Sequence, residues 1–253
     1  DIVSNQNLSI EMFLIRLMHI NSLKIKKQES VENYKSKSSE KNDILSEVKN
    51  ETITAHCPNT GSMQGLLQEG NKVWLSKSNN PNRKLKYTLQ IIEDKTKRVG
   101  VNTHLTNKIV FEALQNNKIK LLPKNIEINP EVKFGKKTRF DFLISKNNFK
   151  AFIEVKNVTL ARNDKIAEFP DAITARGLKH LDELIKAKNM GYEIFLIFVI
   201  QREDCTKFKI AEDIDPEYSK KLSNAMRKKL NVLCYDCKFS SKGIILNNKI
   251  KFY

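Results

Sequence analysis

Cysteine is scarce in this sequence, with four residues in a chain of 253. A chain of this length can bury a hydrophobic core without covalent cross-links, so we interpret the cysteines as free thiols of a protein from a reducing compartment. Cys234 and Cys237 have metal-ligand spacing, but the sequence contains no second such pair. This favours two thiols buried on or near a strand over a zinc site.

Long hydrophobic runs are also absent. The apolar run at 194–200 (IFLIFVI) is far too short to cross a bilayer, which requires about 20 residues. Such a run is typical of a strand buried on both faces. We find no secretion signal and no membrane segment, and we expect a cytoplasmic protein. Because the chain begins with Asp1 rather than Met, organellar targeting by a preceding segment is left open.

Acidic residues are too few to balance the basic ones: 29 against 45, for a formal net charge of +16. Such an excess indicates a polyanionic partner, most commonly nucleic acid. The alternative is a lysine-rich composition inherited from a biased genome, which the many Asn and Ile residues would also fit.

The pattern of turns and periodicities divides the chain into two predicted domains. Residues 1–98 are expected to form a small β-barrel, with a polar surface insertion at 28–50 and strands at 51–55, 72–77 and 86–93. Residues 99–253 are expected to form a mixed α/β domain. Its predicted elements are a helix at 106–116, strands at 126–134, 138–145 and 149–157, a helix at 170–189, a strand at 194–200, a helix from Asp215-Pro216, and strands within 231–253.

Two of these strands carry acids among apolar residues. Glu154 and Lys156, in FIEVKNVTL, lie two positions apart and so point to the same face. Asp141 lies in TRFDFLI, and the loop SKNN joins the two strands as a hairpin, which brings Asp141 near Glu154. Carboxylates in apolar surroundings are costly unless neutralised, and Mg²⁺ or Mn²⁺ would neutralise them. We therefore predict a metal site at Asp141 and Glu154, with Lys156 assisting a water or phosphate; a solvated Glu–Lys ion pair is the alternative.

The spacing D-x(12)-E-x-K resembles the active-site pattern of the PD-(D/E)XK nuclease superfamily. The resemblance implies a catalytic set of Asp141, Glu154 and Lys156. It also makes Glu112, on the preceding helix, a candidate metal ligand, although a surface role is the alternative. Basic residues on the following helix would face phosphates, unless they simply form a solvated face.

A longer series of motifs resembles the sugar fermentation stimulation protein A (SfsA) family. The motifs are HCPNTGSM at 56–63, NPNRKLKYT at 80–88, VGVNT at 99–103, RFDF at 139–142, EVKNVTL at 154–160, FPDAITARGLKHLDEL at 169–184, FVIQRED at 198–204 and IDPEY at 214–218. The resemblance implies an N-terminal OB-like β-barrel and a C-terminal PD-(D/E)XK-like domain. It further implies largely sequence-independent DNA binding and a regulatory link to sugar (maltose) metabolism.

The resemblance also supplies candidate DNA contacts and shows departures. The DNA-binding candidates are His56, Asn59, Thr60, Arg83, Lys84, Arg139, Asn157, Arg176, Lys179 and His180. The segment MFLIRLMHINSLKIKK (12–27) matches the family's opening poorly, and Leu89 replaces a Trp that would offer a stacking group.

We therefore predict a DNA-binding protein with a metal-dependent nuclease site. The alternative is a non-catalytic DNA-binding regulator, with RNA left open as a ligand. Because nuclease-like domains often pair, a homodimer is one option for the oligomeric state.

Overall fold

The computed structural model describes residues 53–135, 138–240 and 243–253. The chain forms two compact units. Of the described residues, the first unit comprises those up to Thr60 together with Gln64–Asn102, and the second comprises Gly61–Met63 together with those from Thr103 to Tyr253. The insertion expected at 28–50 and the segment at 12–27 lie outside the described residues.

The first unit is a small β-structure built around one central strand. Its four strands are β1 (Ala55–His56), β2 (Val73–Lys77), β3 (Tyr87–Asp94) and β4 (Lys97–Gly100). β3 pairs with β1 in parallel and with β2 and β4 in antiparallel fashion, so the strands predicted at 72–77 and 86–93 are confirmed. Leu89, which stands where the resemblance implies a Trp, is fully buried and belongs to the core of this unit.

The second unit contains a six-stranded mixed sheet in the order β13-β12-β10-β7-β6-β5. The strands are β5 (Glu127–Phe134), β6 (Thr138–Lys146), β7 (Phe149–Val158), β10 (Glu193–Ile200), β12 (Asn231–Ser240) and β13 (Gly243–Lys249). β5, β6 and β7 form an antiparallel meander, whereas β7, β10 and β12 are parallel. The carboxyl ends of the three parallel strands therefore meet at one edge of the sheet.

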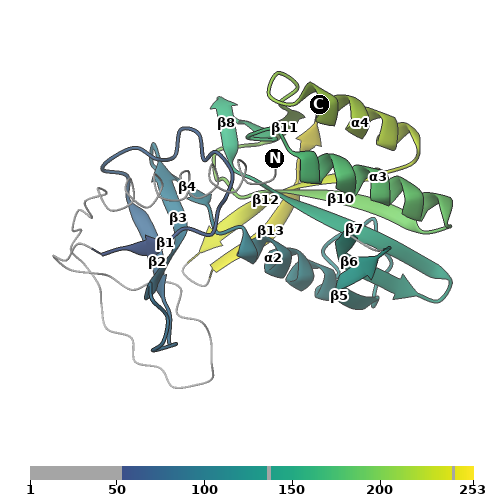
Figure 1. The fold of residues 1–253 in the computed structure, drawn as a ribbon, viewed down its shortest axis with the longest axis horizontal. Coiled ribbons are helices and arrows are strands. Elements are labelled where there is room, and N and C mark those ends of the chain that lie inside the picture. Colours follow the sequence, from purple (N-terminus) through teal and green to yellow (C-terminus); the bar gives the residue numbers. More distant parts are fainter. Residues whose placement is uncertain (1–52, 136–137, 241–242) are drawn as a thin grey trace, which may run out of the picture. The chain divides into compact units, whose positions relative to one another are not determined.

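Helices cover both faces of this sheet (Figure 1). They are α2 (His104–Gln115), α3 (Ala175–Asn189) and α4 (Pro216–Arg227). Alternate residues of β10 pack with α3 and α4 in the main core, while Phe111 of α2 stacks on Phe142 from the other side. From residue 194 onward β10 is buried at every position, which confirms the strand predicted to be buried on both faces.

Helix starts follow their capping residues. Asp215 accepts a hydrogen bond from the Tyr218 N–H at 2.9 Å and Pro216 occupies the first turn of α4, as predicted. The predicted start of α3 at residue 170 is wrong. Thr174 caps this helix by accepting from the Gly177 N–H at 3.0 Å, so the helix begins at Ala175.

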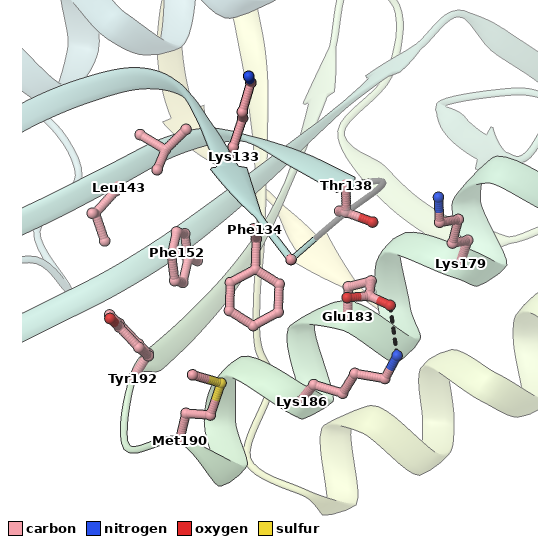
Figure 2. A pocket seen from close by; sticks show the side chains of 12 residues that line it. Lys133, Phe134, Thr138, Leu143, Phe152, Lys179, Glu183, Lys186, Met190 and Tyr192 are labelled. Atoms are coloured by element: carbon pink, nitrogen blue, oxygen red, sulfur yellow. Dashed lines mark hydrogen bonds and ion pairs between the residues drawn. The ribbon is translucent and has the colours of Figure 1, made fainter.

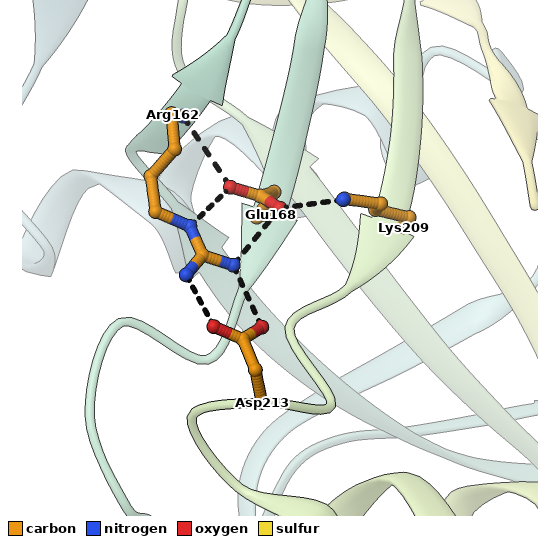
Figure 3. A network of polar contacts seen from close by, with 4 residues as sticks. All are labelled: Arg162, Glu168, Lys209 and Asp213. Atoms are coloured by element: carbon orange, nitrogen blue, oxygen red, sulfur yellow. Dashed lines mark hydrogen bonds and ion pairs between the residues drawn. The ribbon is translucent and has the colours of Figure 1, made fainter.

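A third, four-stranded sheet was not predicted. It comprises β8 (Leu160–Asn163), β9 (Ile166–Phe169), β11 (Lys207–Ile210) and β14 (Lys251–Phe252) in the order β14-β11-β9-β8. Glu168 of β9 is buried and carries a polar network (Figure 3). The Arg162 guanidinium donates to Glu168 at 2.7 Å and to Asp213 at 2.5 Å, and Lys209 lies 3.0 Å from Glu168.

The four cysteines are buried free thiols. Cys234 and Cys237 both lie on β12, in agreement with the interpretation as thiols on a strand, and burial raises the pKa of Cys234 to about 12. In the described part of the chain, no helix combines the length and apolar character needed to cross a membrane.

Candidate active site

Asp141 occupies an irregular position in β6. The pairing of β6 with β5 skips Asp141, and the pairing with β7 begins one residue later, at Phe142. Phe142 packs on α2, whereas Phe140 lies against His180 of α3, with ring centroids 6.5 Å apart. Residues two apart on a regular strand share a face, so the strand turns over at Asp141. This turn directs the carboxylate toward the end of β7.

Burial, two hydrogen bonds and two neighbouring charges set the protonation state of Asp141. Its Oδ2 accepts from the Val155 N–H at 2.7 Å and its Oδ1 accepts from the Asn107 side chain of α2 at 2.8 Å. Burial, with help from the negative charge of Glu154, raises the pKa of Asp141 to about 6, although these hydrogen bonds and Lys156 act in the opposite direction. Near neutral pH the Asp141 carboxylate is mostly ionised, and a small fall in pH is enough to protonate it.

Glu154, on β7, is the most buried charged group of the site, at 3% exposure. The ammonium of Lys156 lies 2.6 Å from its Oε1, and the Nδ1 of His180 contacts the same oxygen. Burial alone would raise the pKa of Glu154, but the charge of Lys156 and the contact with His180 lower it below its usual value. Glu154 is therefore held as a carboxylate inside the protein.

The second oxygen of Glu154 is unsatisfied. Oε2 is buried and has no hydrogen-bond partner among the described residues. Such an atom costs free energy unless a further ligand meets it. Two neighbouring carboxylates, one with an unused oxygen, fit a hard divalent cation that completes its shell with water. The described residues contain no cluster of three or more His, Cys, Asp or Glu side chains poised as metal ligands.

An amide that was not predicted ties the site together. Gln201, which directly follows β10, is fully buried. Its Nε2 donates to Asn157 Oδ1 at 2.6 Å and to Thr106 Oγ1 at 3.0 Å. Thr106 precedes Asn107, the donor to Asp141, and Asn157 follows Lys156. From the sequence, this role of Gln201 could be inferred only by expecting that β7 and β10 are parallel neighbours, so that their carboxyl ends lie side by side.

Glu112, the candidate ligand on α2, lies away from this network. It is exposed, and it lies about 140° around the helix from Asn107. The residue that α2 presents to Asp141 is therefore an amide instead of a third carboxylate.

The basic candidates of the second unit occupy different surroundings. Arg176 and Lys179 of α3 are exposed, whereas His180 is buried against Glu154. Arg139 is exposed and lies 3.7 Å from Glu131. Of these candidates, His180 contacts Glu154 directly, whereas Asn157 accepts a hydrogen bond from Gln201 and follows Lys156 in the chain.

The candidates of the first unit lie in and after β1 and before β3. Arg83 donates to Thr88 at 2.7 Å, while Lys84 and Thr60 are exposed. Asn59 is buried and His56 is half-buried.

Gly61, Ser62 and Met63, which follow Thr60 in the chain, lie beside a carboxylate of the second unit, to which they belong. The Ser62 hydroxyl and the Met63 N–H each donate to Asp171 Oδ2 at 3.4 Å. A Cβ on Gly61 would lie 2.3 Å from the same oxygen. Any side chain at position 61 would therefore require the Asp171 carboxylate to move away from Ser62 and Met63.

Both units match models of known protein families. Residues 104–243 match the family model described as the sugar fermentation stimulation protein RE domain, and residues 43–101 match the SfsA N-terminal OB domain. The chain belongs to the SfsA family. This confirms the resemblance seen in the sequence and the predicted N-terminal OB domain in a mixed α/β fold.

Individual relatives match this SfsA-family chain over most of its length. A sugar fermentation stimulation protein homolog of Pelagibacter ubique is 56% identical over 201 residues, covering 79% of this chain and 87% of the relative. A homolog of Nitrosococcus oceani is 41% identical over 206 residues, covering 80% and 88%. The structure of Pyrococcus furiosus SfsA in complex with Ca²⁺ shares the fold, with a TM-score of 0.75 and 23% identity over 84% of this chain and 91% of that one.

Proposed function

We propose that this SfsA-family protein binds DNA and hydrolyses phosphodiester bonds at Asp141, Glu154 and Lys156 with Mg²⁺ or Mn²⁺. The observation that carries the proposal is the buried, unpartnered Oε2 of Glu154 beside a second carboxylate of raised pKa. A protein that only bound DNA would gain nothing from acids placed near phosphates, because they repel them.

The donor set supports a divalent cation. Asp141 and Glu154 would hold it, and oxygen ligands of this kind suit Mg²⁺ and Mn²⁺. The relative from Pyrococcus furiosus was solved with Ca²⁺, another cation that takes oxygen ligands. A bound Mg²⁺ or Mn²⁺ would neutralise the acids, polarise a phosphate oxygen and acidify a water.

The protein's own groups have separable tasks in this proposal. Lys156 supplies a positive charge and N–H donors for the phosphate oxygens, on which negative charge accumulates during attack. His180 and Lys156 keep Glu154 ionised at its Oε1. Gln201 fixes the chain on both sides of the site through Asn157 and Thr106.

DNA is the proposed substrate because of charge. The chain carries +16, and α3 exposes Arg176 and Lys179 on the helix that supplies His180 to the acid cluster. Guanidinium and ammonium groups contact phosphates without reading sequence, which agrees with sequence-independent binding.

A second function is favoured by one feature of the same site. Oε1 of Glu154 is already compensated by Lys156 and His180, and α2 presents Asn107 where a further acid would strengthen a metal site. These contacts suit a non-catalytic DNA-binding protein that keeps the acids as structure. A role in regulating sugar metabolism, which the names of the relatives suggest, belongs to this alternative.

Cleavage assays distinguish the two functions. Labelled single-stranded DNA, duplex DNA and RNA are incubated with Mg²⁺ or Mn²⁺ and either the wild type, Glu154→Gln or the exposed control Glu212→Gln. We expect the wild type and Glu212→Gln to cut DNA, and Glu154→Gln to bind DNA without cutting it. Equal binding by all three proteins without cleavage under either metal would reject the nuclease and leave the DNA-binding alternative. Cleavage of RNA alone would replace DNA as the substrate.

A further inference from the structure

A cavity of about 760 Å³ lies between α3 and the β5–β6–β7 part of the sheet (Figure 2). Its volume falls in the range of roughly 300–1,000 Å³ that is usual for small-molecule sites. Aromatic and aliphatic side chains form its wall, and lysines lie around it. None of the proposed catalytic groups lines this cavity.

The wall is a continuous row of aromatic rings. The centroid of Phe134 lies 5.3 Å from that of Phe152, edge to face, and the centroid of Phe152 lies 4.8 Å from that of Tyr192. Phe152 is buried, but Phe134 and Tyr192 are only partly covered. Met190, at the end of α3, is 67% exposed beside them. Exposed, polarizable groups of this kind favour a flat aromatic ligand.

The cavity carries positive charge. Lys133 comes from β5, and Lys179 and Lys186 come from α3. The one acid of the lining, Glu183, already pairs with Lys186 at 2.7 Å. A purely apolar ligand would not use these lysines, and a simple anion would not use the aromatic wall. A nucleotide has both a flat base and a phosphate.

The cavity adjoins the acid cluster. Phe152 and Glu154 lie two positions apart on one face of β7, which corresponds to about 7 Å along the strand. On α3, Lys179 directly precedes His180, whose ring contacts Glu154. A strand whose phosphate lay at the acid cluster would therefore have a neighbouring nucleotide within reach of the cavity.

We infer that this cavity is a nucleotide subsite, in which one unstacked base of a DNA strand lies against Phe134, Tyr192 and Met190 while lysines hold its phosphates. The inference rests on the proposed function in DNA binding and adds a preference for single-stranded or opened DNA. Stacking of bases on aromatic side chains is the sequence-tolerant means by which single strands are held.

The test is a binding series with strands that lack one base. Affinity of the wild type is measured in EDTA, which prevents cleavage, for a short single strand and for copies with an abasic site at each position in turn. We expect one central position at which base removal weakens binding about 5- to 150-fold, as expected for loss of one base–aromatic stack. The other positions should change much less.

Two exposed methionines offer matched variants. Met190→Glu places a negative charge at the cavity, whereas Met226→Glu places the same charge on α4, where Met226 is 40% exposed. Met190→Glu should weaken binding of the intact strand and abolish the sensitivity to the central abasic site. Met226→Glu should retain that sensitivity.

Three results would overturn the inference. One is equal sensitivity at every position, and another is a sensitive position that Met190→Glu leaves unchanged; if duplex DNA is still bound in these cases, the proposed function survives. The third is a wild type that binds neither single-stranded nor duplex DNA, which would reject the proposed function together with the subsite.

Discussion

Buried amides and carboxylates at the site act through one another. The two hydrogen bonds that Gln201 donates go to Thr106 and Asn157, which are the chain neighbours of Asn107 and Lys156. Because Gln201 is fully buried, water cannot replace its amide as the donor to Thr106 and Asn157. We therefore expect Gln201 both to stabilise the fold and to position Asn107 and Lys156 at the site.

Replacing Gln201 by leucine tests this contribution. The leucine keeps much of the volume but leaves the oxygens of Asn157 and Thr106 without their donor, which should lower the free energy of unfolding by about 1–3 kcal/mol. If the positioning role is correct, kcat for DNA cleavage also falls while KM changes little. Urea unfolding and steady-state kinetics measure the two effects.

Gln115→Leu is the control, because Gln115 is exposed at the end of α2 and its replacement should change stability by less than about 0.5 kcal/mol. A stability loss in Gln201→Leu with unchanged kcat would make Gln201 purely structural.

Elements with strong local signals were predictable, and short ones were not. The apolar faces of α2 and α4 and the continuous apolar run of β10 identified those elements from the sequence. β8, β9 and β11 are four residues long each, too short for a period to be recognised. Pro170 suggested an early start of α3, but the chain has an irregular segment until Thr174 can cap the helix.

The candidate site divides in the same way. Hairpin geometry is local, so the approach of Asp141 to Glu154 and Lys156 followed from the spacing of the two strands. The contact of His180 with Glu154 depends on how α3 packs on the sheet, and the role of Gln201 depends on parallel pairing between distant strands. Neither is encoded in a local pattern.

The small third sheet carries a buried ionic network around Glu168, from which we expect a defined dependence of stability on pH. Glu168 is buried; burial would raise its pKa, but the hydrogen bonds from Arg162 and Lys209 lower the pKa below the usual value. A lowered folded-state pKa adds stability above the unfolded-state pKa of about 4.3, and this stability is lost as the pH falls through the folded-state value.

We therefore expect Glu168→Gln to lower the free energy of unfolding by about 1.5–3 kcal/mol at pH 7. The difference from the wild type should narrow as the pH falls from about 5 toward 3. Denaturant unfolding across this range measures it, with the exposed Glu212→Gln as control. A difference that is independent of pH would show that shape rather than charge matters at this position.

At the scale of the whole molecule, the net charge of +16 makes any affinity for DNA strongly dependent on salt, whichever of the two functions is correct. The affinity itself is therefore weak evidence for a defined contact surface. The informative quantity is the slope of log affinity against log salt, because each phosphate neutralised on a duplex contributes about −0.9 to it.

Arg176→Ala and Lys220→Ala remove one exposed cation each, from α3 and from α4. If α3 contacts the DNA backbone, Arg176→Ala should make the slope about 0.9 less steep, while Lys220→Ala leaves it unchanged. Fluorescence anisotropy with labelled duplex DNA in EDTA, at a series of salt concentrations, measures both slopes. Equal slopes for the two variants would mean that DNA responds to the overall charge and not to α3. A reduced slope for Arg176→Ala alone would place a phosphate at the helix that carries His180 to Glu154, next to the carboxylates proposed to cut it.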